Sequence, residues 1–138
     1  MSLDFDSARM HNPYITSEHE EWRFQLRRFL DQEIIPHADE WDEHGKIPDE
    51  LWPRAAKIGL FSLGYPEKYG GISEGIDIWH HNIVNEEFAR IGAGGISASL
   101  MIHGIALPPV VEFGSDEIKN EVIPAVIRGE KRISLGVT

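Results

Sequence analysis

Residues 17–34 read SEHEEWRFQLRRFLDQEI, and this stretch decides the fold class. Ser17 and Glu20 fit a capping box, in which the serine hydroxyl accepts a hydrogen bond from the amide three residues on and the glutamate reaches back to the cap amide. Apolar residues then recur at helical spacing, at Trp22, Leu26, Phe29 and Leu30. The intervening arginines are expected mainly on the solvent-facing side: Arg23, Arg27 and Arg28. The stretch therefore predicts an amphipathic helix that ends near Ile34.

Proline and glycine divide the following residues into further helical segments. The expected segments are residues 36–44, residues 48–58, a helix marked by Trp79 that ends at Gly92, an apolar segment that Pro108 and Pro109 should kink or divide, and a last helix from Ser115 to Gly129. The last helix is expected to carry Ile118, Val122 and Val126 on its apolar side.

The end of the chain follows a different pattern. Ile133, Leu135 and Val137 alternate with small or polar residues, which is the period of a strand. One strand cannot satisfy its own backbone, so a β-rich region should follow. We therefore predict an all-α, multi-helix fold with one terminal strand that belongs to a missing β-domain. The expected organisation is an extension at 1–15, a helical domain at 16–129, and the first strand of the truncated β-domain at 130–138.

Composition and charge exclude several classes of protein. The net charge of -10 argues against a nucleic-acid partner, which requires a positive surface. The absence of cysteine excludes disulfides and thiolate metal sites. No apolar run is expected to reach the roughly 18 residues of a membrane span. The first residues lack the basic and apolar regions of a signal peptide, so we expect a cytoplasmic protein.

Several polar groups invite a catalytic or metal-binding interpretation. His80 and His81 precede Glu86 and Glu87, but adjacent histidines project about 100° apart on a helix, so a structural or exposed role is favoured and no metal ligand is assigned. His103 lies in an apolar segment, where a hydrogen-bonded core or interface histidine is favoured over a catalytic one. The residues alone therefore predict a helical domain without a reaction.

An ordered series of short motifs goes further. It consists of Pro36-His37-Ala38, Trp41-Asp42, Ile47-Pro48, Gly59-Leu60, Pro66-Glu67-Lys68-Tyr69-Gly70-Gly71, Glu86-Glu87-Phe88-Ala89-Arg90, Phe113-Gly114-Ser115-Asp116-Glu117-Ile118-Lys119, Ile123-Pro124, Gly129-Glu130 and Leu135-Gly136-Val137-Thr138. In order and spacing, the series resembles the N-terminal domain of the acyl-CoA dehydrogenases over about residues 16–138.

The resemblance implies a flavoenzyme that dehydrogenates acyl-CoA thioesters between the α and β carbons. A carboxylate removes the α-proton and FAD receives the β-hydride; an electron-transferring flavoprotein reoxidises the flavin, and the full-length protein is a homotetramer or homodimer. The catalytic base of that family lies beyond Thr138, so no catalytic residue is assigned to this chain. A flavin oxidase, a nitroalkane oxidase and a non-catalytic helical interaction module remain as alternatives.

Two groups of site residues follow from the same resemblance. Leu135, Val137 and Thr138 match positions that contact the flavin, although ordinary strand packing explains their alternation as well. A second group matches the helix that lines the acyl-chain pocket and has the spacing of one helical face, which would equally suit a core: Ala98, Met101, Ile102 and Ile105.

Overall fold

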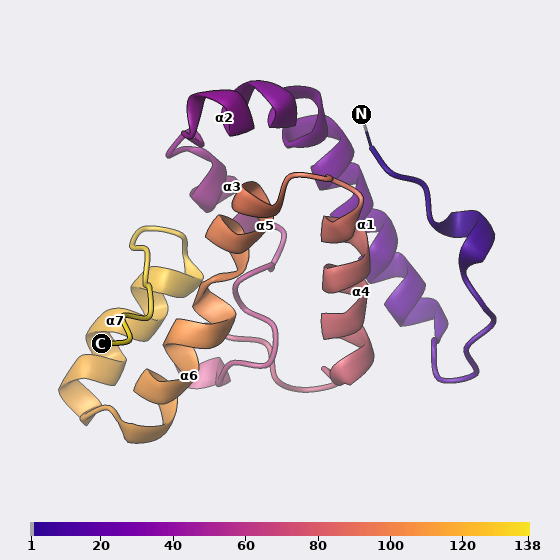
Figure 1. Ribbon diagram of the computed structural model, residues 1–138. Coiled ribbons are helices and arrows are strands. Elements are labelled where there is room, and N and C mark those ends of the chain that lie inside the picture. Colours follow the sequence, from indigo (N-terminus) through magenta and orange to yellow (C-terminus); the bar gives the residue numbers. More distant parts are fainter. Residues whose placement is uncertain (1) are drawn as a thin grey trace. The chain divides into compact units, whose positions relative to one another are not determined.

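The computed structural model describes residues 2–138, and every regular element in that range is a helix (Figure 1). The chain divides into two compact units. Unit 1 contains the residues up to Ile47 together with Asp77–Ser97, and unit 2 contains Pro48–Ile76 together with Ala98–Thr138. The all-helical fold class is therefore confirmed.

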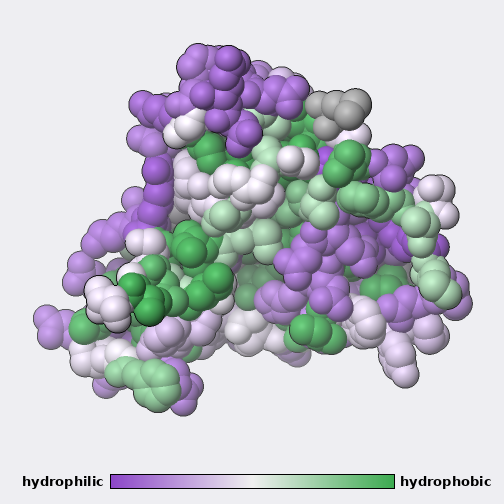
Figure 2. Space-filling view, viewed as in Figure 1, coloured by the Kyte–Doolittle hydropathy of each residue, from purple (hydrophilic) through white to green (hydrophobic). Residues whose placement is uncertain are grey.

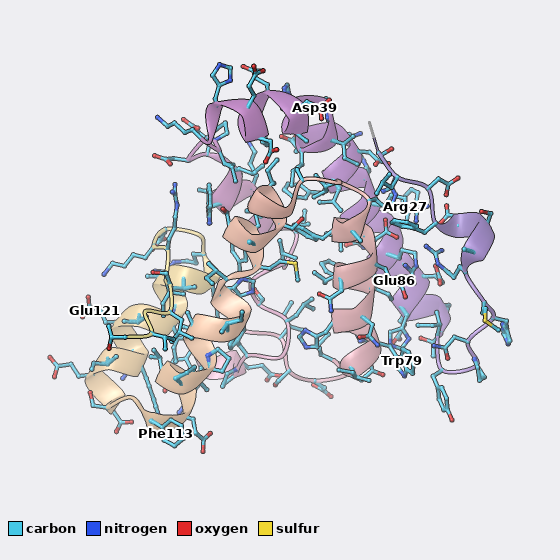
Figure 3. All side chains as sticks on the ribbon, in the orientation of Figure 1. Arg27, Asp39, Trp79, Glu86, Phe113 and Glu121 are labelled. Carbon is cyan, nitrogen blue, oxygen red and sulfur yellow. The ribbon has the colours of Figure 1, made fainter. Side chains whose placement is uncertain are left out.

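Unit 1 is built around two long helices. Helix α1 spans Ser17–Glu33 and α4 spans Ile78–Ala89; they lie side by side (Figure 1). The predicted apolar row of α1 is largely buried, since Leu26 and Leu30 have no exposed surface and Phe29 retains 7%. The shorter elements of unit 1 are the 3-10 turns η1 (Asp6–Ala8) and η2 (Ile35–His37), helix α2 (Ala38–His44), and the first residues of α5 (Gly94–Met101). Helix α2 presents an acidic, hydrophilic surface, and Asp39 marks it in Figure 3 (Figures 2 and 3).

The N-cap of helix α1 lies one residue before the predicted one. Thr16 is the N-cap: its Oγ1 accepts from the amide of His19 at 3.5 Å, and its own amide donates to His19 Nδ1 at 3.0 Å. The capping box assigned to Ser17 and Glu20 is therefore wrong. Both Thr16 and Ser17 carry a suitable hydroxyl, and in the structure His19 takes the place that glutamate has in the usual capping box.

Unit 2 contains α3 (Leu51–Lys57), the 3-10 turn η3 (Glu67–Tyr69), the end of α5, α6 (His103–Phe113) and α7 (Asp116–Ile127). Helices α6 and α7 pack together, and their core is completed by two tyrosines from the segment around η3. The buried residues of this cluster are Tyr65, Tyr69, Leu107, Ile123, Val126 and Ile127. The η3 segment folds back so tightly that a Cβ on Gly71 would lie only 2.1 Å from the Tyr65 carbonyl oxygen. Only glycine fits there.

Two predictions about the helices of unit 2 require correction. Ile118 was expected on the apolar side of α7, but it is 48% exposed, and Ile123, Val126 and Ile127 form the buried row. The apolar segment divides at Ile102, whereas Pro108 and Pro109 lie inside α6. The carbonyls that these prolines leave without a helical donor belong to exposed residues, so water can satisfy them.

The strand predicted at 130–138 requires a partner from a β-domain, so it stays a prediction. Within residues 2–138 this segment has no regular structure and pairs with no strand. Alternation defines which side chains share a face, but a strand also needs a neighbour to receive its backbone hydrogen bonds.

Candidate functional site

The most concentrated electrostatic site of unit 1 surrounds Glu87 on α4. Its side chain has no exposed surface. Arg27 of α1 donates to it twice, from Nε at 2.8 Å and from Nη2 at 2.7 Å. Arg23 and Arg90 each donate one further bond at 3.2 Å. The carboxylate is thus held by three guanidinium groups.

The arginines of this cluster have second acidic partners. Arg23 donates to Glu86 at 2.6 Å, and Arg27 donates to both oxygens of Asp6 at 2.7 and 2.9 Å. The expectation that Arg23 faces solvent is wrong, since Arg23 is only 4% exposed. A hydropathy pattern assigns arginine to the surface, and it cannot register a partner that lies 64 residues away.

This arrangement fixes the charge of Glu87. Burial alone would raise the pKa of the Glu87 carboxyl, but the hydrogen bonds and positive charges of Arg27, Arg23 and Arg90 outweigh burial and lower it. A carboxylate stabilised in this way is a poor proton acceptor. Glu87 is therefore a structural anion that joins α4 to α1, and Figure 3 shows Glu86 and Arg27 on these two helices.

A second polar cluster joins the N-terminal ends of the same helices. Asp77 is the N-cap of α4, and its Oδ1 accepts from the amides of Trp79 at 2.9 Å and His80 at 3.3 Å. The same oxygen lies 2.9 Å from His19 Nε2 and 2.9 Å from His80 Nδ1. The two imidazole rings are 4.2 Å apart. These hydrogen bonds hold the pKa of Asp77 well below its ordinary value, with that from His19 contributing most.

The residues matched to the acyl pocket lie where α5 meets α6 in unit 2. Ala98 and Ile105 are exposed, the latter by 60%, while Met101 and Ile102 are half-buried. Within residues 2–138, Gly94–Phe113 is long and apolar enough to cross a membrane by length and composition, so the expectation of no such run is wrong. A single stretch of this kind is weak evidence for a membrane span, because apolar helices of soluble proteins have the same composition.

His103 follows this row and is hydrogen-bonded. Its Nδ1 lies 3.0 Å from the Leu100 carbonyl oxygen, and its ring packs edge-on against Phe61 at 4.8 Å. Tyr65 donates its hydroxyl to the His103 carbonyl at 3.2 Å, and burial raises the pKa of Tyr65 to about 12. These contacts agree with the structural role expected for His103.

The residues matched to the flavin lie in the open C-terminal segment. Leu135 is 50% exposed, Val137 is 85% exposed, and Thr138 is exposed as well. The apolar surface of this region is visible in the space-filling view, where Figure 1 draws the yellow end of the chain (Figure 2). Residues 133–138 make no backbone hydrogen bond to the rest of residues 2–138, so their polar groups remain available to a partner.

A helical domain with a buried arginine–glutamate cluster and an exposed apolar helix is thus defined, and comparison with known proteins identifies its family. Residues 16–130 match the family model described as "Acyl-CoA dehydrogenase, N-terminal domain". The chain is 36% identical over 115 residues to the mitochondrial long-chain specific acyl-CoA dehydrogenase of Sus scrofa. The chain belongs to the acyl-CoA dehydrogenase family and is its N-terminal domain, as the motif series indicated.

Solved structures agree with this assignment. A putative acyl-CoA dehydrogenase from Mycobacterium smegmatis superposes with a TM-score of 0.77 at 37% identity, covering 87% of this chain and 31% of that one. An acyl-CoA dehydrogenase complexed with FAD from Bacillus anthracis gives a TM-score of 0.72 at 29% identity, and the match covers 88% of this chain and 21% of that one. The match to the Sus scrofa protein covers 83% of this chain but 26% of that protein, so the chain spans about a quarter of its relative's length.

Proposed function

We propose that this chain is the N-terminal part of an FAD-dependent enzyme that dehydrogenates acyl-CoA thioesters between the α and β carbons. The observation that carries the proposal is the family match over residues 16–130, which includes the exposed apolar row of α5 and α6. The proposal includes an electron-transferring flavoprotein as redox partner and a homotetramer or homodimer as the full-length assembly. A cytoplasmic location stays a prediction, since the Sus scrofa relative is named as mitochondrial.

The apolar row supplies one wall for the acyl chain. Ala98, Met101, Ile102 and Ile105 are apolar, and all four are exposed or half-buried. Covering such side chains with an aliphatic substrate removes apolar surface from water on both sides, which stabilises the complex by about 0.8 kcal/mol per buried methylene. Met101 is unbranched and adaptable, which suits a surface that must fit a flexible chain.

The C-terminal segment supplies the first contacts to the flavin. The free backbone groups around Leu135 and Val137, together with the hydroxyl of Thr138, offer donors and acceptors that suit a polar ring edge. FAD, when bound, supplies the redox chemistry of the reaction. The residues of this chain contact the ring and exclude water from one side of it.

The proton-abstracting carboxylate is assigned outside this chain. A general base must bind a proton readily near the working pH. Glu87 has a lowered pKa and is enclosed by arginines, and Glu86 is paired with Arg23 at 2.6 Å. Both carboxylates are therefore occupied in holding α1 and α4 together.

The test uses the complete flavin-loaded protein. Short, medium, long and branched acyl-CoAs are mixed with it anaerobically, and loss of the oxidised flavin absorbance is recorded, followed by turnover with an artificial electron acceptor. We expect reduction by at least one acyl-CoA class. If no acyl-CoA reduces the flavin, the proposed activity is wrong.

A substitution tests the apolar wall separately. Met101→Trp fills the space beside the row and is expected to shift the preferred substrate to shorter chains, measured as kcat/KM across the series. Phe24→Trp, at an exposed position of α1, is the matched control and should leave the preference unchanged. An unchanged chain-length preference in Met101→Trp would remove these four residues from the acyl site.

A further inference from the structure

The N-terminal ends of α1 and α4 bring together three groups that are common metal ligands. They are His19 from α1, Asp77 at the cap of α4, and His80 one turn into α4. One ligand atom from each lies within 4.8 Å of the other two. Both histidines are buried, at 4% and 7% exposure, whereas the Asp77 side chain is 47% exposed. The cluster thus has two ordered imidazoles and a side open to solvent.

We propose that His19, Asp77 and His80 form a binding site for a zinc ion, held by His19 Nε2, Asp77 Oδ1 and His80 Nδ1. Two imidazole nitrogens and one carboxylate oxygen are a donor set that suits zinc rather than magnesium or calcium, which prefer oxygen alone. The site belongs to unit 1, whereas the apolar row and the C-terminal segment belong to unit 2, and it does not depend on the proposed dehydrogenase activity.

The distances fit such an ion after a small adjustment. Zinc binds imidazole nitrogen and carboxylate oxygen at about 2.0–2.1 Å, so two donors on one tetrahedral ion lie about 3.3 Å apart. Each histidine nitrogen is now 2.9 Å from Asp77 Oδ1, a hydrogen-bond distance. An ion therefore requires each nitrogen to move away from the oxygen by a few tenths of an ångström, and the two nitrogens, which lie within 4.8 Å of each other, to reach the same separation of about 3.3 Å.

The surroundings of His19 allow it to act as a ligand after one change. Coordination through Nε2 requires the proton to reside on Nδ1. Thr16 Oγ1 lies 2.9 Å from His19 Nδ1 and can accept that proton, but the bond that the Thr16 amide now donates to the same nitrogen at 3.0 Å must then break. A hydrogen bond to the second ring nitrogen is the usual way in which proteins orient a metal-bound histidine. The ring of His19 is also fixed by its contact with the ring of His80.

Two features limit the affinity. The N-terminal ends of α1 and α4 face the site, and their partial positive charge disfavours a cation. An ion must also displace the cap bonds that Asp77 Oδ1 accepts from the amides of Trp79 and His80, and the bond that His80 Nδ1 accepts from the Asp77 amide at 3.2 Å. We therefore expect one zinc ion per chain with micromolar rather than nanomolar affinity. The ion would add a link between two helix ends that already share hydrogen bonds and a contact between imidazole rings.

The test is zinc titration of the purified, untagged protein after treatment with a chelator, followed by calorimetry. We expect a saturable site with one zinc ion per chain and release of protons on binding, because the ligands must be deprotonated. Binding should weaken at least about tenfold in Asp77→Asn and in His19→Gln, since each loses a ligand. Asparagine is also a good N-cap, so Asp77→Asn keeps the start of α4.

His81→Gln is the matched control, because His81 is exposed, adjacent to the site and not among its ligands. It should bind zinc as the wild type does. Far-UV circular dichroism verifies that each variant is folded, and the visible spectrum of added cobalt provides a second readout of the same ligands. No saturable binding by the wild type would overturn the proposal. Unchanged affinity in Asp77→Asn and His19→Gln, or loss of binding in His81→Gln alone, would overturn it as well.

Discussion

Replacing Glu87 by glutamine tests whether the buried ion cluster holds unit 1 together. The substitution keeps the size of the side chain but removes its charge, and it places an amide donor among arginine donors. Arg27 loses two charge-assisted hydrogen bonds, and Arg23 and Arg90 lose one each. Removing one partner from a buried ion pair costs about 3–5 kcal/mol.

The lower end of that range is expected here. Arg23 keeps Glu86, Arg27 keeps Asp6, and Arg90 keeps Asp31 at 3.0 Å, so no guanidinium is left without an acidic partner. We therefore predict that Glu87→Gln lowers the free energy of unfolding by about 3 kcal/mol, measured by urea denaturation with circular dichroism detection.

Glu86→Gln is the matched control for this experiment. Glu86 also binds Arg23, but its side chain is 51% exposed, so we expect a loss below about 1 kcal/mol. A Glu87→Gln variant within about 0.5 kcal/mol of the wild type would refute the reasoning, since that is the range of ordinary surface substitutions. Equal losses in the two variants would refute it too, because burial would then make no difference.

Three further predictions concern acidity, backbone conformation and the isolated chain. The folded-state pKa of Asp6 is lowered from 3.8 to about 2, mainly by its hydrogen bond to Arg27, and the pKa of Glu87 is lowered from 4.5. The stability that these two carboxylates contribute is therefore present at neutral pH and is lost as the pH falls below about 4.5. Acid titration should destabilise the wild type more than Glu87→Gln, and equal acid sensitivity of the two proteins would contradict this. Gly129→Ala should cost more than about 2 kcal/mol in urea denaturation, because Gly129 has φ +70° and its Cβ would lie 2.5 Å from the Trp52 carbonyl oxygen. Gly45→Ala, at φ +63° with no atom within 4 Å, should cost only about 1 kcal/mol, and a similar loss in both would show that the close approach is unimportant. The purified chain of residues 1–138 should neither retain FAD on gel filtration nor reduce a dye with acyl-CoA, and flavin absorbance with turnover would disprove that.

Local patterns predicted the parts of this fold that depend on neighbouring residues. The helical spacing of Leu26, Phe29 and Leu30 identified the buried face of α1, and Gly45 indeed ends α2 with a positive φ. The burial of a side chain was predicted wrongly where it depends on a residue that is distant in the sequence. Arg23 is buried because α4 brings Glu87 beside it.

The candidate metal site shows the same limit of sequence analysis. Sequence spacing directed attention to His80 and His81, which are adjacent on one helix and project in different directions. The structure instead groups His80 with His19, which lies on another helix, through a hydrogen-bonded aspartate. A signal was present in the sequence, since His19 and His80 each occupy the third position after a residue that can cap a helix. Only the packing of α1 against α4 shows that the two caps meet.

The two units differ in the buried charges that hold them together, and this difference bears on their roles. Unit 1 pairs its buried charges internally, so its cohesion depends on contacts between α1, α4 and the residues around η1. Both units expose large apolar side chains, such as Phe24 by 67% in unit 1, but those of unit 2 include members of the groups matched to the acyl pocket and the flavin: Ile105 by 60% and Val137 by 85%. Exposed apolar surface of this kind marks binding sites, since water contact with it is unfavourable. Substitutions in the ion cluster should therefore act first on stability, whereas substitutions along α5, α6 and residues 133–138 should act first on what the complete protein binds.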